Sequence, residues 1–247
     1  MLVSVLMAVY NGAGTVDEAI ASILAQSFRD WELIVVDDGS TDETRKRIER
    51  YDDPRIRVLY NAANSGLSAS LNVAFRASTG SLIARMDADD FALPHRLQRQ
   101  VDFLRDHPEI DVVGGAATLW GNDGIYQRPE THEQMAQVLF TENPFIHPTV
   151  MMRRRFLEAL GGYDETIQRA EDYDLWLRGV TRFRYYNIQE PLIQYRAPTR
   201  ATWKQARDAA LTVWRHGLRT GTPSRGAYGA LRYYAAFALW RLGVRFG

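Results

Sequence analysis

The chain has 247 residues, 46% of them hydrophobic, so it is long enough and apolar enough to bury the core of a large domain. Its 30 basic and 30 acidic residues cancel, which excludes the global positive field that recruits nucleic acid. The sequence has no cysteine, which excludes disulfides, thiolate nucleophiles and cysteine-bound zinc, so any metal must be bound through oxygen or histidine.

The first half of the chain alternates between strand-length apolar runs and helical patterns. Its apolar start lacks the basic region and the cleavage site of a signal peptide, so we expect a strand there and a cytoplasmic protein. The expected strands are residues 3–9, 32–36, 56–60 and 81–86, and the expected helices are 16–26, 41–51 and 68–77. This alternation predicts an α/β fold with a mostly parallel central sheet and helices on both faces.

The second half has a more mixed pattern. A Gly-Asn-Asp-Gly turn at residues 121–124 predicts a hairpin between strands 112–120 and 125–127, and a short strand is expected at 149–152. Helices are expected at 97–106, 133–140 and 171–178, and again from residue 203 onward. We therefore expect an α/β domain over residues 1–200 and a helical extension over residues 201–247.

A glycine pair follows the first strand. Gly12-x-Gly14 before a helix, with Asp37 at the end of the next strand, is similar to the fingerprint of dinucleotide-binding proteins. The third glycine position holds Asp17, however, and a carboxylate there disfavours a pyrophosphate at the helix start. A dinucleotide site, and with it an oxidoreductase, stays open beside a plain turn from strand to helix.

Carboxylates stand where two of the expected strands end. Asp37 and Asp38 follow one strand, and Asp87 and Asp89 follow another. Ligands of parallel sheets bind beyond the carboxyl ends of the strands, so these side chains are candidates for a ligand site. Asp37 and Asp38 can accept hydrogen bonds from a nucleotide base or ribose, although they would also fit a simple strand end before a helix cap.

The segment "RMDADDFALPHR", residues 85–96, gathers Asp87, Asp89 and Asp90 directly after an apolar run. Neighbouring carboxylates repel one another unless a cation neutralises them, and Mg²⁺ or Mn²⁺ prefers such oxygen ligands. Because Mg²⁺ is usually bound by one or two carboxylates together with substrate phosphates, the pattern indicates a nucleoside diphosphate partner. The alternative is a solvated acidic loop before the helix that follows.

Acidic residues also open the helix expected at 171–178. Glu171, Asp172 and Asp174 could act in acid–base chemistry, or they could only complement the helix dipole. His147 precedes a short strand, where an isolated histidine is more often structural.

Taken together, these motifs resemble those of the family 2 glycosyltransferases, which are inverting enzymes with a GT-A fold. The resemblance covers about the first 196 residues, and several separate motifs occur in the family's order. It implies transfer of a sugar from a nucleotide-sugar donor, with UDP as the expected nucleotide. The matching segments are residues 3–11, 26–28, 32–42, 64–66, 87–90, 94–97, 147–148, 161–163 and 171–172.

The resemblance implies a donor site. Tyr10 and Asp38 would hold the base with Asp37 nearby, Asp89 would bind Mn²⁺ or Mg²⁺ directly, and Asp87 would reach the ribose or the water shell of the metal. The nucleotide-binding residues implied in this way are Ala8, Tyr10, Asn11, Asp37, Asp38, Asn64, Gly66 and Asp87.

The resemblance also implies an acceptor site. Asp172 matches the general base that takes the proton of the acceptor hydroxyl, and Glu171 would orient the acceptor or the base. His147 and Tyr163 would lie on the acceptor side. A single base acting on the acceptor implies one displacement and inversion of the anomeric carbon.

Two departures refine this expectation. The Gln-x-x-Arg-Trp motif of processive members is missing apart from a fragment at 194–196, so we expect single-sugar transfer rather than polymerisation. Ala8 stands where some relatives carry a polar residue near the base, which weakens the assignment of uridine. A catalytically silent subunit that only binds nucleotide-sugar is a further alternative.

The C-terminal extension is basic and rich in aromatic residues. Residues 200–247 hold nine arginines and lysines but a single acidic residue, Asp208. Segment 203–247 could contact the inner face of the plasma membrane, where a lipid-linked acceptor of surface polysaccharide assembly would be found. It could equally be a helical cap on the domain, and its longest charge-free run, residues 233–240, is too short to span a bilayer.

Overall fold

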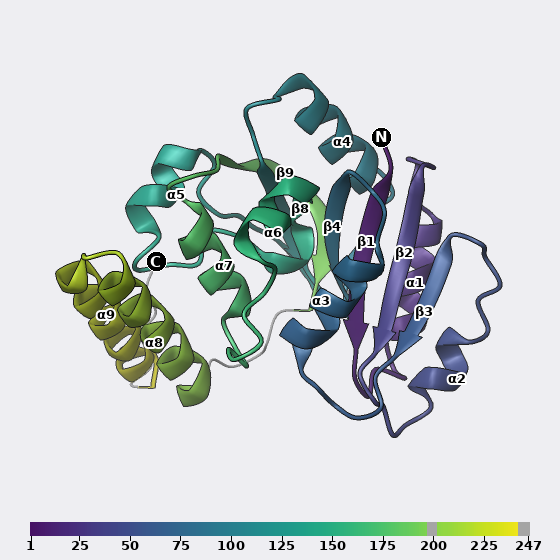
Figure 1. Cartoon of the computed structure of the whole chain (residues 1–247), viewed down its shortest axis with the longest axis horizontal. Coiled ribbons are helices and arrows are strands. Elements are labelled where there is room, and N and C mark those ends of the chain that lie inside the picture. The colour runs from purple at the N-terminus through teal and green to yellow at the C-terminus, as the bar shows by residue number, and fades with distance from the viewer. Residues whose placement is uncertain (197–201, 242–247) are drawn as a thin grey trace.

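The computed structural model describes residues 1–196 and 202–241. The first half of the chain forms the expected alternation of strands and helices (Figure 1). Its elements are β1 (Val3–Val9), α1 (Val16–Leu24), β2 (Trp31–Asp37), α2 (Thr44–Ile48), β3 (Ile56–Tyr60), α3 (Leu67–Ala77) and β4 (Leu82–Asp87).

The second half adds short strands and the remaining helices. They are β5 (Phe91–Ala92), α4 (Arg96–Asp106), β6 (Val112–Leu119), β7 (Asn122–Tyr126), α5 (His132–Val138), the 3-10 helix η1 (His147–Thr149), β8 (Met151–Arg153), α6 (Arg154–Leu160), α7 (Glu171–Gly179), β9 (Tyr185–Tyr195), α8 (Trp203–Arg219) and α9 (Pro223–Arg241).

Within the described residues, nine strands form one sheet in the order β3-β2-β1-β4-β8-β6-β9-β5, with β7 paired to β6. The strands from β3 to β4 are parallel, β8 runs antiparallel between β4 and β6, and β9 is parallel to β6. The predicted α/β fold class is thereby confirmed. The parallel half has the strand order typical of sheets that bind ligands at their carboxyl edge.

Some local predictions differ from the structure. Helix α2 spans only Thr44–Ile48 rather than 41–51, because the Thr41 amide and the Asp42 carboxylate are hydrogen-bonded to the loop after β1. The predicted hairpin is present, but strand β7 begins at Asn122, so its turn lies at residues 120–121 rather than 121–124. Strand β9 and helix α6 were not anticipated at all.

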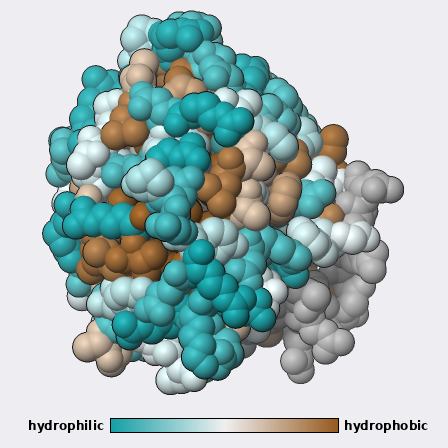
Figure 2. All heavy atoms as spheres, turned by 90° about the vertical axis from the view of Figure 1, so that its right-hand side faces the viewer, coloured by the Kyte–Doolittle hydropathy of each residue, from teal (hydrophilic) through white to brown (hydrophobic). Residues whose placement is uncertain are grey.

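Two hydrophobic clusters lie on opposite faces of the sheet, since alternate strand residues point to opposite sides. On one face, Val5 and Val35 pack with α1 and α4. On the other face, Leu6 and Ile83 pack with α3, α6 and α7. Figure 1 shows α3, α6 and α7 in front of the sheet. The end of the molecule that carries β3 and α2 presents interspersed hydrophilic and hydrophobic residues (Figure 2).

Helices α8 and α9 lie side by side at one end of the molecule, against α7 (Figure 1). Close approach of the pair requires glycine, because a Cβ on Gly217 would lie 2.8 Å from the Cα of Gly226. Val213 of α8 is fully buried in the cluster that includes α7. The expected cap is therefore present, and no helix in residues 1–196 or 202–241 has the length and apolarity to cross a membrane.

Some predictions about the extension lie outside the described residues. The proposed domain boundary at residues 200 and 201 falls in the segment 197–201, and Arg200, Arg245 and Phe246 also lie outside the described ranges.

Candidate active site

The strand pairings bring the predicted carboxylates to one edge of the sheet. Val9 pairs with Asp37 and Ala8 pairs with Asp87, so the ends of β1, β2 and β4 are level. Tyr10 follows directly after β1, and its side chain is 49% exposed at this edge. The structure thus brings four of the predicted nucleotide-site residues together.

The loop after β1 is tied to the loop after β2 through Asn11. Its amide N–H donates to Ser40 Oγ at 2.9 Å, and its side-chain Oδ1 accepts from the Thr41 amide at 2.8 Å. Asn11 has a left-handed backbone with φ of 52°, which asparagine tolerates better than most residues. These contacts fix the surroundings of Tyr10 before any ligand binds.

Asp38 shapes the loop that carries Asn64 and Gly66. Its carboxylate accepts hydrogen bonds from Asn61 Nδ2 at 2.7 Å, from the Ser65 amide at 2.9 Å and from the Gly66 amide at 2.9 Å. Asp37 has fewer such contacts, since one oxygen accepts from the Ser40 amide at 3.0 Å. Asp38 is therefore already engaged within the protein, whereas Asp37 retains more capacity to accept from a ligand.

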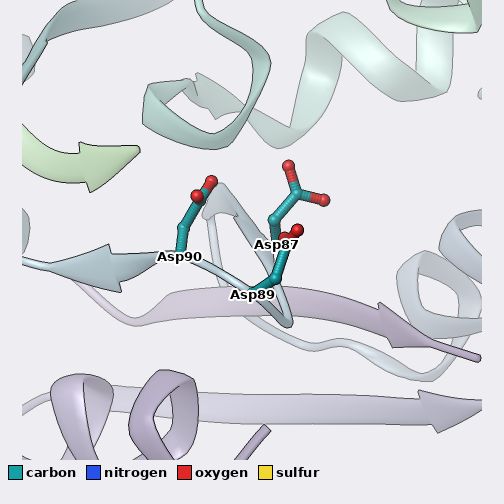
Figure 3. A group of neighbouring side chains, drawn as sticks. All are labelled: Asp87, Asp89 and Asp90. Carbon is teal, nitrogen blue, oxygen red and sulfur yellow. The ribbon is translucent and has the colours of Figure 1, made fainter. Parts of the chain in front are cut away.

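Three carboxylates meet after β4. Oxygen atoms of Asp87, Asp89 and Asp90 lie within 4.8 Å of one another, and Figure 3 shows the carboxylates on the same side of the turn. Asp90 Oδ1 accepts from the Arg196 amide at 2.8 Å, but its buried Oδ2 has no hydrogen-bond partner. An unpartnered buried oxygen is costly, and a divalent cation is the partner that such a set of oxygens fits.

The electrostatics of this cluster agree with that fit. Burial and the charge of Asp87 raise the pKa of Asp90 to about 8 and also raise the pKa of Asp89. The cluster therefore resists full ionisation on its own. The sequence indicated Asp87 and Asp89 as ligands, and the geometry adds Asp90 to them.

Arg85 is a further candidate site residue, which the sequence analysis missed. Its side chain is only 3% exposed and forms an ion pair with Asp87, two residues along the same strand. Burial lowers the pKa of Arg85, but the charges of Asp87, Tyr163 and Glu171 outweigh it, and the net shift is upward. A charged residue in the otherwise apolar run 82–86 was the signal that could have identified it.

The residues expected on the acceptor side lie around the start of α7. Ala170, immediately before the helix, has a left-handed backbone with φ of 59°, a strained conformation for alanine. Glu171 is 7% exposed, and burial together with the charge of Asp172 raises its pKa to about 8. Burial also raises the pKa of Asp172. The Asn143 side chain, which donates a hydrogen bond to Asp172 Oδ2 at 2.7 Å, opposes this shift but does not outweigh it.

His147 and Tyr163 join this acidic pair. His147 Nε2 lies 3.0 Å from the Tyr163 hydroxyl, and its Nδ1 lies 3.9 Å from Glu171 Oε1. Burial and the charge of Arg85 hold the pKa of His147 well below its ordinary value, so the ring is neutral at pH 7. His147 therefore offers a polar contact near Glu171 and does not neutralise its charge.

Arg85 links the residues expected on the donor side with those expected on the acceptor side. Its guanidinium pairs with Asp87, and its charge also acts on Glu171 and Asp172. Asn64 and Gly66 line a cavity of about 370 Å³ together with Glu165 and residues 167–169 of the loop that leads into α7. The predicted site residues thus lie at the ends of β1, β2 and β4, in the loop after β3 and around the start of α7.

The glycine pair after β1 serves as a turn. A Cβ on Gly12 would lie 2.6 Å from a methyl group of Val9, so glycine is required there by packing. Asp17, at the third glycine position of the dinucleotide fingerprint, forms a 2.5 Å ion pair with Arg47. This carboxylate occupies the start of α1, which a dinucleotide pyrophosphate would need.

Comparison with known proteins agrees with this geometry. A family model described as glycosyl transferase family 2 matches residues 4–161. The chain is 38% identical over 234 residues to a putative glycosyltransferase of Bacillus subtilis, EpsE, with 90% of this chain and 84% of that protein covered. It is 34% identical over 213 residues to the O-antigen biosynthesis glycosyltransferase WbnJ of Escherichia coli, with 83% of each covered.

Solved structures show the same fold. The crystal structure of S. aureus TarS in complex with UDP-GlcNAc matches all of this chain and 77% of that chain, with a TM-score of 0.76 at 20% sequence identity. The sheet order, the family match and the relatives agree over most of the chain. It has the GT-A fold, belongs to glycosyl transferase family 2 and is a glycosyltransferase.

Proposed function

We propose that this glycosyltransferase transfers a single sugar, with inversion, from a nucleotide-sugar donor to a hydroxyl group of a glycan or lipid-linked acceptor. UDP is the expected nucleotide, and surface polysaccharide biosynthesis is the expected setting. The observation that carries the proposal is the triad of Asp87, Asp89 and Asp90, which follows β4 level with the loops that close the ends of β1 and β2. In support, TarS was crystallised with UDP-GlcNAc, and WbnJ is named for O-antigen biosynthesis.

On the donor side, the exposed ring of Tyr10 and the carboxylate of Asp37 would contact the base. Asp38 and Asn11 would act mainly by fixing the loops around them, because their side chains are engaged in hydrogen bonds to those loops. The small side chain of Ala8, which pairs with Asp87, leaves room beside the nucleotide. Asn64 and Gly66 would border the same site from the loop after β3.

Asp89, with Asp87 and Asp90, would hold Mn²⁺ or Mg²⁺. All available ligand atoms are carboxylate oxygens, and one of them is buried without a partner, which fits a hard divalent cation. Bound there, the cation would offset the negative charge that develops on the departing diphosphate.

On the acceptor side, Asp172 would accept the proton of the acceptor hydroxyl as that oxygen bonds to the anomeric carbon. The bond from this carbon to the donor phosphate breaks at the same time, and its electron pair leaves with the nucleoside diphosphate. A carboxylate suffices as base because the hydroxyl becomes acidic as the new bond forms. Glu171, His147 and Tyr163 would orient the acceptor.

The remaining parts of the proposal concern the surroundings of the enzyme. Residues 1–200 would form the catalytic domain, and residues 201–247 an extension that contacts the inner face of the membrane peripherally. A catalytically silent nucleotide-sugar-binding subunit is the alternative, whereas membership of family 2 argues against the oxidoreductase.

Calorimetric titration with UDP, with and without Mn²⁺, tests the donor site. Wild type should bind UDP only with the ion, Asp89→Ala should lose that binding, and Asp106→Ala, which removes an exposed carboxylate on α4, should behave as wild type. Asp172→Asn should retain metal-dependent UDP binding but lose about 10²–10⁴-fold in transfer rate across a donor and acceptor panel.

Equal UDP binding with and without the ion in all these proteins would remove the metal role of the triad. Metal-dependent UDP binding without turnover by wild type, across the whole panel, would favour the silent subunit. Full activity of Asp172→Asn would overturn the assignment of the base.

A further inference from the structure

A second cavity lies between helix α8 and the loop that leads into α7. It has a volume of about 210 Å³ and is lined by residues 166–169 on one side and by Arg207, Asp208, Leu211, Thr212 and Arg215 on the other. Its loop side is shared with the cavity that contains Asn64 and Gly66. The α8 cavity therefore neighbours the acceptor side but contains none of the residues assigned to donor binding or catalysis.

The α8 cavity has an excess of positive charge. Of its three arginines, Arg207 is paired with Asp208 at 2.8 Å. Arg169 and Arg215 are exposed and form neither an ion pair nor a side-chain hydrogen bond with any part of the chain that the structure describes. Two unpaired guanidinium groups at one cavity suit a phosphate group, which arginine binds through two parallel hydrogen bonds.

An apolar surface continues from this cavity along α8. Leu211, Trp214 and Leu218 are exposed and follow one another at spacings of three and four residues, so they share one face of the helix. Leu211 belongs to this face and also lines the cavity. The opposite face of α8 is packed against the protein through Val213 and Gly217.

The combination of an apolar face and unpaired arginines specifies the chemistry of the partner. A soluble anion would use the arginines but leave the apolar face in water, and an uncharged apolar partner would leave the arginines unpaired. An anionic lipid surface satisfies both, because apolar side chains enter the interface while basic groups meet the phosphates.

We propose that helix α8 lies on an anionic lipid bilayer, with Leu211, Trp214 and Leu218 in the interface and with a lipid phosphate between Arg169 and Arg215. This inference rests on the proposed function, since it names the surface at which a lipid-linked acceptor would be met. Arg169 precedes Glu171 by two residues. The bilayer surface is therefore next to the loop that begins the acceptor site.

Vesicle flotation of the full chain tests the inference, with phosphatidylglycerol-containing vesicles compared against pure phosphatidylcholine. Wild type should float with the anionic vesicles and much less with the neutral ones. The Arg169→Gln/Arg215→Gln double variant should lose roughly fivefold in binding for each arginine. Leu218→Ser should lower binding to the anionic vesicles several-fold by removing an exposed apolar contact.

Matched variants make the result specific. Leu231→Ser removes a leucine of α9 that is 66% exposed, against 54% for Leu218, and should leave vesicle binding unchanged. Arg50→Gln/Arg76→Gln removes two exposed arginines elsewhere on the surface and should also have no effect beyond the loss of net charge. Equal losses in test and control variants would overturn the assignment to α8.

Equal binding of wild type to anionic and neutral vesicles would overturn the role of the arginines, and absence of binding to both would overturn the inference as a whole. The UDP titration of the same proteins separates this outcome from failure of the proposed function. If the protein binds UDP in a metal-dependent way but does not bind vesicles, only the proposed membrane contact of α8 is refuted.

Discussion

The proposed nucleotide-binding loops around Asp38 and the acidic pair that opens α7 treat their carboxylates in opposite ways. On the donor side, Asp38 accepts three hydrogen bonds from neighbouring loops, two of them from backbone amides. On the acceptor side, Glu171 is buried beside Asp172, and each carboxylate is held in a form that resists ionisation. The loops around Asp38 are thus ordered before a nucleotide binds, whereas ionisation of the two carboxyl groups at the start of α7 is unfavourable.

This difference indicates where the fold gives up stability for chemistry. Hydrogen-bonded carboxylates order loops with little loss of folding stability, while buried carboxylates that repel one another destabilise the folded chain. Arg85 limits the penalty, because its buried charge lies between Asp87 and the α7 pair. Substitutions on the two sides should therefore change stability in opposite directions, and three experiments examine this difference.

The largest effect is expected for Arg85→Met. Loss of the buried guanidinium leaves Asp87 without its partner and Glu171 without a nearby positive charge, which should lower the free energy of unfolding by about 3 kcal/mol. Urea denaturation would measure this, and Arg85→Lys, which keeps the charge, should recover part of the loss. Unchanged stability of Arg85→Met would show that the two sides are not joined through this residue.

A smaller effect of opposite sign is expected for Glu171→Gln. The folded-state pKa of about 8 lies above the ordinary value of 4.5, so the carboxyl's contribution to stability is full below about pH 4.5 and is lost as the pH rises through about 8. The variant should therefore be more stable than wild type at pH 8, with a much smaller difference at pH 5.

Urea denaturation at both pH values measures this gain, and transfer activity should fall in the same variant. An equal gain at pH 5 and pH 8 would trace the effect to packing instead of charge.

The smallest effect is expected on the donor side, for Asn61→Ala. The change removes the side-chain amide that donates to Asp38 at 2.7 Å, so stability should fall by about 1 kcal/mol. The KM for the nucleotide-sugar should rise several-fold while kcat changes little, because the loop would be less well ordered before binding.

Gln98→Ala is the control for Asn61→Ala, since it removes a comparable amide contact to Asp102 on α4, away from the site. A fall in kcat with an unchanged KM would mean that Asp38 does more than shape the loop.

Much of the parallel half of the fold could be predicted from sequence, because β1, β2 and β4 are apolar runs of strand length bounded by polar turns. Strand β9 could not, since it contains Asn187, Glu190 and Pro191, residues that disfavour a central strand. The structure accommodates Pro191 where the pairing of β6 with β9 shifts register. Such irregularities depend on tertiary packing that no local pattern contains.

The candidate site was predictable where its residues sit at strand ends, as with Asp37 and Asp87. The engagement of Asp38 by Asn61 and Gly66 could not be foreseen, because it joins loops whose side-chain directions are set by the fold. Arg85 is marked in the sequence only as a charge within an apolar run, and its proximity to Glu171 depends on where the fold places the start of α7.

The register of strand β4 fixes the face of the sheet on which its two charged residues lie. Arg85 and Asp87 stand two residues apart on one face, and pairing with β1 on one side and β8 on the other fixes that face. A deletion of one residue within β4 would turn both charges to the opposite side of the sheet. The position of the carboxylates at the end of β4 is therefore set by strand register, which tolerates no change in length, and not by the loops around it.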